Sequence, residues 1–300
     1  MRKVLITGAG GFIGRTLAEK LLKKDYFVYG VDINRLGFSD LEKYDNFLGI
    51  EVEKNDFSSI LNFQIDKLDY VYHLAWAGKL SGKDLNDFEL QLSNVIMTNN
   101  LLNIIKKINV KKFIFCGSIS HYKMNKTFKD VNSDIYGLSK MYAGKITMNF
   151  CLNNNIEGNV ALLANTYGIG DLSDKAVNTM LKKLQNDESL ELIDKQILND
   201  WVYITDTING LISIAEKGKN YKEYYIGHRN IPTFEQNISS MVKAVNKQVE
   251  LHYGYYKDNT VADYDKINLD DLYFDTGFEC QVSTVDGIKR LDEWIKNLEE

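Results

Sequence analysis

The segment that most constrains the fold of this chain is a glycine-rich turn at residues 7–14, with the sequence TGAGGFIG. An apolar run at 4–6 precedes it, and a helical pattern follows, with apolar residues at 17, 18, 21 and 22 on one face. In this order of strand, turn and helix, Gly8 allows a sharp bend, Gly11 lets a pyrophosphate approach the backbone, and Gly14 permits close helix packing. The N–H groups that begin the helix would face the phosphates. The turn therefore predicts a dinucleotide-binding site.

A glycine triplet alone also fits a tight structural turn, and a second signal favours the dinucleotide site. Residues 26–31 predict the next strand, and Asp32 stands at its end. An acidic residue about 20 residues beyond such a turn binds the ribose hydroxyls of adenosine. Asp32 repels a 2′-phosphate, so we expect NAD(H) to be favoured over NADP(H). Arg35 offers a counter-charge nearby that weakens this preference.

The alternation of elements predicts an α/β fold with a Rossmann-type doubly wound parallel sheet. Strand-like runs at 4–6, 26–31, 46–52, 68–75, 111–116 and 158–163 alternate with helical patterns. The alternation breaks down after Ala164, which indicates a smaller C-terminal α/β substrate lobe. We expect a dinucleotide-binding domain at 1–164 plus about 199–225. The interleaved substrate lobe takes about 165–198 plus 226–300, and ends in an amphipathic helix.

Composition excludes several other classes of protein. The net charge of -5 and the absence of a dense basic run argue against nucleic-acid binding. No apolar run reaches the length of a membrane span, and the first three residues lead straight into a strand, without the apolar region of a signal peptide. Three widely spaced cysteines predict a reduced, cytoplasmic protein. The four histidines form no metal-ligand pair.

The spacing TGxxGxxG resembles the extended branch of the short-chain dehydrogenase/reductase superfamily, the NAD-dependent epimerases and dehydratases that act on nucleotide sugars. Residues 73–78 resemble its HLAA segment, with Trp76 as a departure, and 165–168 and 199–206 resemble its NxYG and RDFxYVDD segments. The resemblance implies that Asn94 is structural. Asp56 is a candidate for the adenine amino group; its alternative interpretation is a helix N-cap, and the two roles do not exclude each other. The cofactor contacts implied are Gly8, Gly11, Phe12, Ile13, Gly14, Asp32, Asp56, Phe57, Leu74, Ala75, Trp76, Tyr136 and Lys140.

A catalytic site is predicted at Ser118, Tyr136 and Lys140. The pattern Tyr-x-x-x-Lys occurs three times, also at Tyr122/Lys126 in a polar loop and at Tyr253/Lys257 far from any glycine turn. Only Tyr136 and Lys140 open a helix, where residues four apart share a face. A free tyrosine has a pKa of about 10, and a nearby ammonium and the nicotinamide ring favour its phenolate. Tyr136 then exchanges a proton with a sugar hydroxyl, to which Ser118 donates a hydrogen bond, while Lys140 anchors the ribose.

Two departures from the family pattern bear on the reaction. The Asp-Glu pair that follows the catalytic Ser/Thr in 4,6-dehydratases is replaced by Ile119 and Ser120, which disfavours a dehydratase. The arginine that clamps the substrate diphosphate is replaced by Asn199. Lys182, Lys183 and Arg229 are candidates to compensate. The substrate contacts implied are Ser118, Ser120, Asn165 and Asn199, where Asn165 also fits a loop cap.

The leading expectation is NAD(P)-dependent oxidation and reduction at C4 of a nucleotide-diphosphate hexose, best as a 4-epimerase. A 4-ketoreductase or a C4 dehydrogenase is the alternative, and an NAD-binding regulator on the same fold is the non-enzyme alternative. The family resemblance also implies a homodimer, formed by the helix near 84–108 and the helix beginning at Tyr136.

Overall fold

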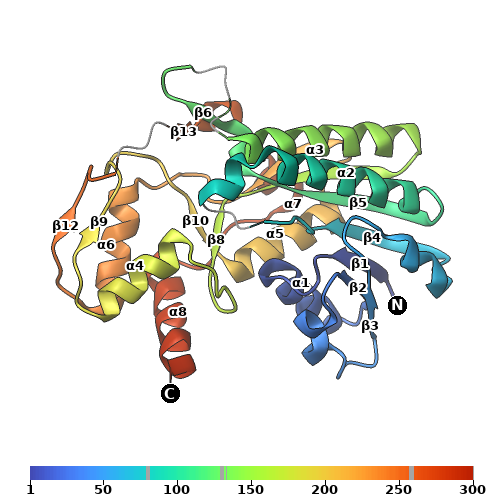
Figure 1. The fold of residues 1–300 in the computed structure, drawn as a ribbon, viewed down its shortest axis with the longest axis horizontal. Helices are drawn as coiled ribbons and strands as arrows, with labels where there is room; N and C mark the ends of the chain where they lie inside the picture. The colour runs from blue at the N-terminus through green and yellow to red at the C-terminus, as the bar shows by residue number, and fades with distance from the viewer. Residues whose placement is uncertain (79–81, 129–131, 133, 257–259, 300) are drawn as a thin grey trace.

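The computed structural model describes residues 1–78, 82–128, 132, 134–256 and 260–299. A seven-stranded parallel sheet runs through its centre in the order β3-β2-β1-β4-β5-β7-β11 (Figure 1). The strands are β1 (Lys3–Thr7), β2 (Phe27–Asp32), β3 (Phe47–Glu51), β4 (Lys67–His73), β5 (Asn109–Ser118), β7 (Glu157–Leu163) and β11 (Lys222–Ile226). The predicted Rossmann-type fold is confirmed. The six predicted strands are present, and β11 adds a seventh that the sequence did not single out.

Helices cover both faces of the sheet. On one face α2 (Phe88–Ile105) lies beside α3 (Ile135–Asn153), and α3 packs on β5 and β7. On the other face α1 (Phe12–Leu22) packs against α5 (Ile204–Lys217). The strands between them are buried on both faces, which explains why their sequences are continuous apolar runs and do not alternate.

A smaller group of elements forms the second lobe, at the left of Figure 1. Its helices are α4 (Ala176–Gln185), α6 (Phe234–Val245) and α8 (Thr284–Glu299), and its short strands are β8 (Asn165–Tyr167), β9 (Leu190–Glu191), β10 (Trp201–Tyr203) and β12 (Leu251–His252). Buried apolar side chains of this lobe continue into the core under α1 and α5. This shared core fixes the lobe against the sheet. The two-domain division predicted from the sequence stays a prediction.

A short antiparallel pair stands where the two lobes meet, formed by β6 (Lys123–Asn125) and β13 (Thr260–Ala262). β6 begins directly after the 3-10 helix η4 (Ile119–Tyr122), which itself follows β5. The pairing therefore connects the end of a central strand to a segment more than 130 residues later in the chain.

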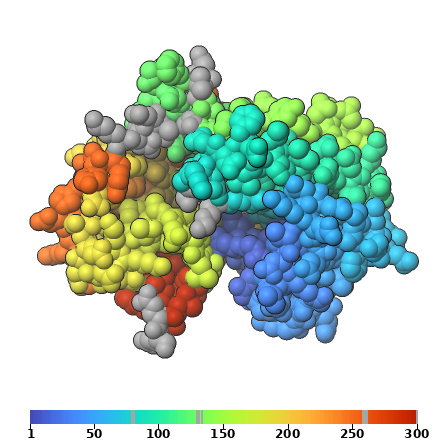
Figure 2. Space-filling model, viewed as in Figure 1, coloured from blue at the N-terminus to red at the C-terminus, as the bar shows by residue number. Residues whose placement is uncertain are grey.

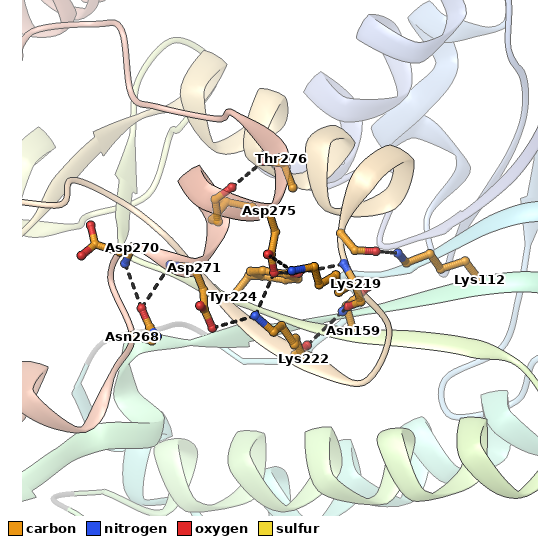
Figure 3. Close-up of polar contacts among 12 residues, drawn as sticks. Lys112, Asn159, Lys219, Lys222, Tyr224, Asn268, Asp270, Asp271, Asp275 and Thr276 are labelled. Atoms are coloured by element: carbon orange, nitrogen blue, oxygen red, sulfur yellow. Dashed lines mark hydrogen bonds and ion pairs between the residues drawn. The ribbon is translucent and has the colours of Figure 1, made fainter.

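A polar network at the amino end of β11 holds the short helix α7 (Asp271–Thr276) against the sheet (Figure 3). The carboxylate of Asp275 binds Lys219 Nζ at 2.6 Å, Lys222 Nζ at 2.8 Å and the hydroxyl of Tyr224 at 2.8 Å. The two ammonium groups, Lys219 first, hold the pKa of Asp275 well below its usual range. Because the carboxylate of Asp275 and the ammonium groups of Lys219 and Lys222 already have partners in the fold, we assign this network a structural role.

Candidate active site

A cavity of about 810 Å³ lies at the carboxyl ends of the central strands, between the sheet and the second lobe. Figure 2 shows the surface hollowed where N-terminal segments (blue) face the segments around α4 (yellow-green). On the sheet side the cavity is lined by Gly8, Gly11, Phe12, Ile13, Gly14, Leu74, Trp76, Ser118, Ser120, Tyr136 and Lys140. On the lobe side it is lined by Asn165, Lys175, Lys183, Glu191, Asn199 and Trp201, among others. One cavity thus joins the glycine turn, the predicted catalytic residues and the predicted substrate residues.

Three of the four glycines of the turn, Gly8, Gly11 and Gly14, meet different surroundings. Gly8 adopts φ +73°, and a Cβ there would lie 2.8 Å from the backbone nitrogen of Ala75. A Cβ on Gly14 would lie 2.0 Å from the carbonyl oxygen of Gly8. A Cβ on Gly11 would meet only that same oxygen, at 3.4 Å, so the space over Gly11 is open. Packing requires glycine at positions 8 and 14, whereas Gly11 leaves an open face toward the cavity.

The start of α1 fits a bound pyrophosphate. Its N-cap, Gly11, supplies no side-chain hydrogen bond, and its first turn contains no acidic residue. The first N–H groups of a helix carry a partial positive charge and need acceptors from outside the helix. The open face at Gly11 and these N–H groups together form a cradle for an anion.

Asp32 lies beside this turn, at the end of β2. Its Oδ2 accepts the N–H of Gly10 at 2.8 Å, and its Oδ1 accepts the N–H of Ile33 at 2.8 Å. The guanidinium of Arg35 donates to Glu42 at 2.8 Å. Arg35 is therefore already paired, which reduces its value as a counter-charge for a 2′-phosphate.

Asp32, Asp56, Phe57 and Ala75 do not line the cavity, and their cofactor contacts stay predictions. Asp56 accepts the N–H of Ser58 at 2.8 Å and its hydroxyl at 3.0 Å, just before a 3-10 helix. Phe57 is buried in the core. The carboxylate of Asp56 thus makes the kind of local turn contact that was its alternative interpretation.

Ser118, Tyr136 and Lys140 meet in the cavity because three local features position them. β5 extends two residues past the predicted strand and ends at Ser118. Asp134 caps α3 by accepting the N–H of Gly137 at 2.6 Å, which places Tyr136 in the first turn. Lys140 follows one turn later on the same helix, and its ammonium donates to the carbonyl of Cys116 at 2.8 Å.

Burial controls the charges of this group. It raises the pKa of the Tyr136 phenol to about 12, an effect that the hydroxyl of Ser118 opposes. It also lowers the pKa of the Lys140 ammonium to about 8. Tyr136 is therefore a neutral phenol at neutral pH in the protein chain, and an additional positive charge beside it is needed to make it a base.

Trp76, which follows β4, packs against both Tyr136 and Lys140. Its ring meets that of Tyr136 edge-on at 6.2 Å, and the ammonium of Lys140 lies 4.1 Å from its ring centroid. Its indole N–H donates to Gln91 at 2.9 Å. Asn94 clamps the neighbouring Ala77 through both its N–H and its carbonyl, at 2.8 and 3.0 Å. These two hydrogen bonds connect α2 with the segment after β4, which fits the structural role expected of Asn94.

A buried chain of hydrogen bonds, which the sequence analysis missed, connects β1, β4 and α2 at the carboxyl ends of these strands. The hydroxyl of Thr7 donates to His73 Nδ1 at 2.7 Å, and His73 Nε2 donates to the hydroxyl of Thr98 at 3.0 Å, which donates to the carbonyl of Asn94. These directions follow because the only hydrogen of the Thr98 hydroxyl goes to Asn94, so His73 Nε2 must donate to Thr98 and the neutral ring accepts at Nδ1. Burial lowers the pKa of His73 to about 3, so the imidazole is neutral.

This histidine predicts an acid-sensitive fold. Its pKa is about 3 in the folded protein and 6.5 ordinarily, so between these values the unfolded chain binds more protons. The free energy of unfolding therefore falls as pH decreases, by about 2 kcal/mol at about pH 5. Urea unfolding of the native protein and of His73→Gln, each at neutral pH and at about pH 5, isolates this contribution. The two proteins have all other titratable groups in common, so the native protein should lose about 2 kcal/mol more. Equal losses in the two proteins would show that His73 does not titrate as described.

Of the two other Tyr-x-x-x-Lys matches, the described residues Tyr122, Lys126 and Tyr253 do not line the cavity. The hydroxyl of Tyr122 donates to Glu223 at 2.7 Å, and burial together with this carboxylate raises the pKa of the phenol. Lys257 lies outside the described residues. Among the described residues of the three matches, Tyr136 and Lys140 are the pair that lines the cavity together with the glycine turn.

The lobe side of the cavity brings two predicted substrate residues together. The parallel pairing of β8 with β10 sets Asn165 beside the segment that follows Asn199, and the amide of Asn165 donates to Asn199 at 2.9 Å. Of the candidates for the missing arginine, Lys183 lines the cavity and Lys182 does not. Arg229 pairs with Asp270 and lies over the ring of Tyr273, also outside the cavity lining. Lys175 is a further cavity lysine that the sequence analysis missed.

Two other kinds of site find no support in the described residues. No group of three or more His, Cys, Asp or Glu side chains there is arranged to hold a metal ion. No helix among those residues has the length and apolar character needed to span a bilayer. The cytoplasmic location expected from the cysteines stays a prediction.

A model of the NAD-dependent epimerase/dehydratase family matches residues 4–227. A UDP-glucuronate 4-epimerase of Thermodesulfobacterium geofontis is 24% identical over 311 residues, which cover 97% of this chain and 95% of that protein. A human dTDP-D-glucose 4,6-dehydratase is 22% identical over 317 residues, which cover 98% and 90%.

The fold also matches solved structures over nearly its whole length. The crystal structure of the UDP-glucuronic acid 4-epimerase from Bacillus cereus, in complex with UDP-glucuronic acid and NAD, superposes with a TM-score of 0.81. It is 25% identical, and the match covers 99% of each chain.

Proposed function

The chain belongs to the NAD-dependent epimerase/dehydratase family, and from this we propose that it oxidises and re-reduces C4 of a nucleotide-diphosphate hexose as a 4-epimerase. The observation that carries the proposal is the cavity that Ser118, Tyr136 and Lys140 share with the glycine turn. The 4-epimerases among the similar proteins support this reaction.

The cofactor we propose is NAD. The open face over Gly11 and the uncapped start of α1 would hold its pyrophosphate, and Asp32 would accept hydrogen bonds from the adenosine ribose. Leu74, Trp76 and Lys140 would line the nicotinamide end. When bound, NAD supplies the acceptor for the C4 hydride and a positive charge beside Tyr136.

Cofactor preference gives a direct prediction. Asp32 is a carboxylate beside the turn, and Arg35 is paired with Glu42, so a 2′-phosphate meets uncompensated negative charge. We expect NADH to bind at least tenfold more tightly than NADPH, which corresponds to about 1.4 kcal/mol. Titration calorimetry with both cofactors measures the ratio. Equal affinities would contradict the assigned position of Asp32.

Tyr136 moves the proton in this proposal. Its phenolate takes the proton of the C4 hydroxyl as the hydride leaves, and returns it after the sugar presents its other face. Ser118 donates a hydrogen bond to the same oxygen. Because burial raises the pKa of Tyr136, the base forms only when a cation is bound beside it. This couples proton transfer to the presence of the oxidised cofactor.

The lobe side of the cavity suits the diphosphate. Lys175 and Lys183 supply positive charge there, although each pairs with a carboxylate, Asp171 at 3.1 Å and Glu191 at 2.9 Å. Lys183 thus takes over the charge of the arginine that Asn199 replaces. Asn165 and Asn199 contribute amide groups beside it.

We propose that the protein is not a 4,6-dehydratase, although dehydratases are among the similar proteins. Water elimination needs an acid and a base beside the sugar, and the two residues after Ser118 are Ile119 and Ser120. A 4-ketoreductase, a C4 dehydrogenase and an NAD-binding regulator remain the alternatives.

A panel of UDP-, GDP-, CDP- and dTDP-hexoses with their 4-keto forms tests the function. Epimerase activity inverts C4 with no net change in absorbance of the reduced cofactor, as followed by NMR of the sugar. Stoichiometric NADH oxidation with a 4-keto sugar identifies the reductase, and net NADH formation identifies the dehydrogenase. Cofactor binding without turnover of any member identifies the regulator.

We also propose a homodimer through the outer faces of α2 and α3. Phe88, Leu92 and Ile96 recur every four residues along α2, and Leu138 and Tyr142 lie on α3, with exposed fractions between 47% and 65%. Two such apolar helix faces in each chain suit a four-helix contact.

The predicted dimer is expected to dominate at micromolar concentration. Light scattering should give twice the chain mass of 34.4 kDa for the native protein. Leu92→Glu buries a charge in the contact and should release monomers. Leu172→Glu, at a residue that is 77% exposed outside these helices, serves as the matched control. A monomeric native protein would remove this proposal.

A further inference from the structure

Among the described residues, Lys123 differs from the other lysines of the active-site cavity in having no side-chain partner. Four described lysines line this cavity: Lys123, Lys140, Lys175 and Lys183. Lys140 donates to a backbone carbonyl, and Lys175 and Lys183 pair with carboxylates. Within the described part of the chain, the ammonium of Lys123 has no hydrogen-bond acceptor or carboxylate of its own. A half-buried, unpaired ammonium favours binding of an anion.

Lys123 lies at the sugar end of the cavity, which is the end lined by Ser118 and Ser120. It is the first residue of β6 and comes five residues after Ser118. Its N–H donates to the carbonyl of Ser120, which closes the one-turn helix η4 and holds Lys123 close to that serine. Ser118, Ser120 and Lys123 line the cavity from this one short segment. The lysines assigned to the diphosphate, by contrast, lie at the other lobe, around α4.

No described carboxylate forms an ion pair with Lys123. Asp134 also lines the cavity, but its Oδ1 accepts the N–H of Gly137 at the start of α3. The other described carboxylates of the cavity lining are Asp171, Asp174 and Glu191, which belong to the segments around α4 and β9. In the part of the chain that the structure describes, the sugar end therefore presents hydroxyl groups and the available positive charge of Lys123.

We propose that Lys123 binds a carboxylate carried by the sugar, which makes the substrate a nucleotide-diphosphate uronic acid and Lys123 its selectivity residue. This inference rests on the proposed function, because the C4 oxygen must lie between Ser118 and Tyr136. In a hexose, C6 is attached to C5, the neighbour of C4, so the C6 group lies within reach of the segment that follows Ser118. A carboxylate at C6 makes a charge-assisted hydrogen bond with an ammonium, stronger than that of a neutral hydroxymethyl group.

Binding of UDP-glucuronate and UDP-glucose to the NAD-loaded protein tests this assignment by titration calorimetry. The two ligands differ only at C6. The native protein should bind UDP-glucuronate about 10- to 100-fold more tightly. Lys123→Met should remove this preference by weakening UDP-glucuronate alone, and Lys123→Arg should keep most of it. Lys183→Met, the matched control, should weaken both ligands by the same factor.

Each other outcome counts against the proposal in a distinguishable way. Equal affinities in the native protein would show that no group recognises the carboxylate. Equal weakening of both ligands by Lys123→Met would assign Lys123 to the shared UDP portion. In both cases the C4 chemistry of the proposed function stands. If neither ligand binds the native protein, the selectivity proposal fails, and the proposed function fails for UDP-sugars as well.

Discussion

Replacing Tyr136 with phenylalanine is expected to lower kcat by about 10²- to 10⁴-fold, the usual contribution of a positioned acid–base group. The change removes one hydroxyl from a buried ring and little volume, so the fold and the affinity for NAD should remain. Steady-state kinetics with the substrate found in the panel, together with NAD titration, separate these two effects.

The chain provides its own controls for this variant. Tyr122→Phe removes a hydroxyl that binds Glu223, and Tyr253→Phe changes a tyrosine that lies outside the cavity lining. Both should leave kcat nearly unchanged. Full activity in Tyr136→Phe, combined with loss of activity in Tyr122→Phe, would mean that the wrong tyrosine has been assigned as the base.

Two alanine substitutions in the glycine turn should separate folding from cofactor binding. Gly14→Ala puts a methyl group 2.0 Å from the carbonyl oxygen of Gly8, so backbone must move, and we expect a loss of roughly 3 kcal/mol or complete unfolding. Gly11→Ala meets only one atom, at 3.4 Å, in an ordinary backbone conformation. It should keep the free energy of unfolding within about 0.5 kcal/mol.

The same Gly11→Ala variant should bind NAD about 10- to 100-fold more weakly, because its methyl group stands on the open face where the pyrophosphate approaches. Urea unfolding and NAD titration of both variants measure the two effects. A stable Gly14→Ala protein would contradict the packing described at the turn. Unchanged NAD affinity in Gly11→Ala would move the pyrophosphate elsewhere.

The sequence predicted those parts of the fold that depend on local residue patterns. The central strands are buried on both faces and read as continuous apolar runs, and Tyr136 and Lys140 share a helix face by spacing alone. The strands of the second lobe contain only two or three residues, too few to show any periodicity. Their pairing depends on contacts between distant segments.

The missed residues of the site share this non-local origin. His73 binds Thr7 and Thr98, which lie 66 and 25 residues away in the sequence and meet only when β1 pairs with β4 and α2 packs over them. Lys123 looks like an ordinary loop lysine until the cavity brings it opposite α4. Arg229 looked equally suitable for the diphosphate, and its pairing with Asp270 appears only in three dimensions.

The most direct test of the proposed chemistry is the fate of the hydrogen at C4. A nucleotide hexose that carries deuterium at C4 is incubated with the NAD-loaded protein in ordinary water, and the sugar is followed by NMR. The account predicts inversion at C4 with the deuterium retained there, because the same hydride leaves and returns while Tyr136 exchanges only the hydroxyl proton. Inversion with replacement of the deuterium by solvent hydrogen, or turnover without any change at C4, would contradict it.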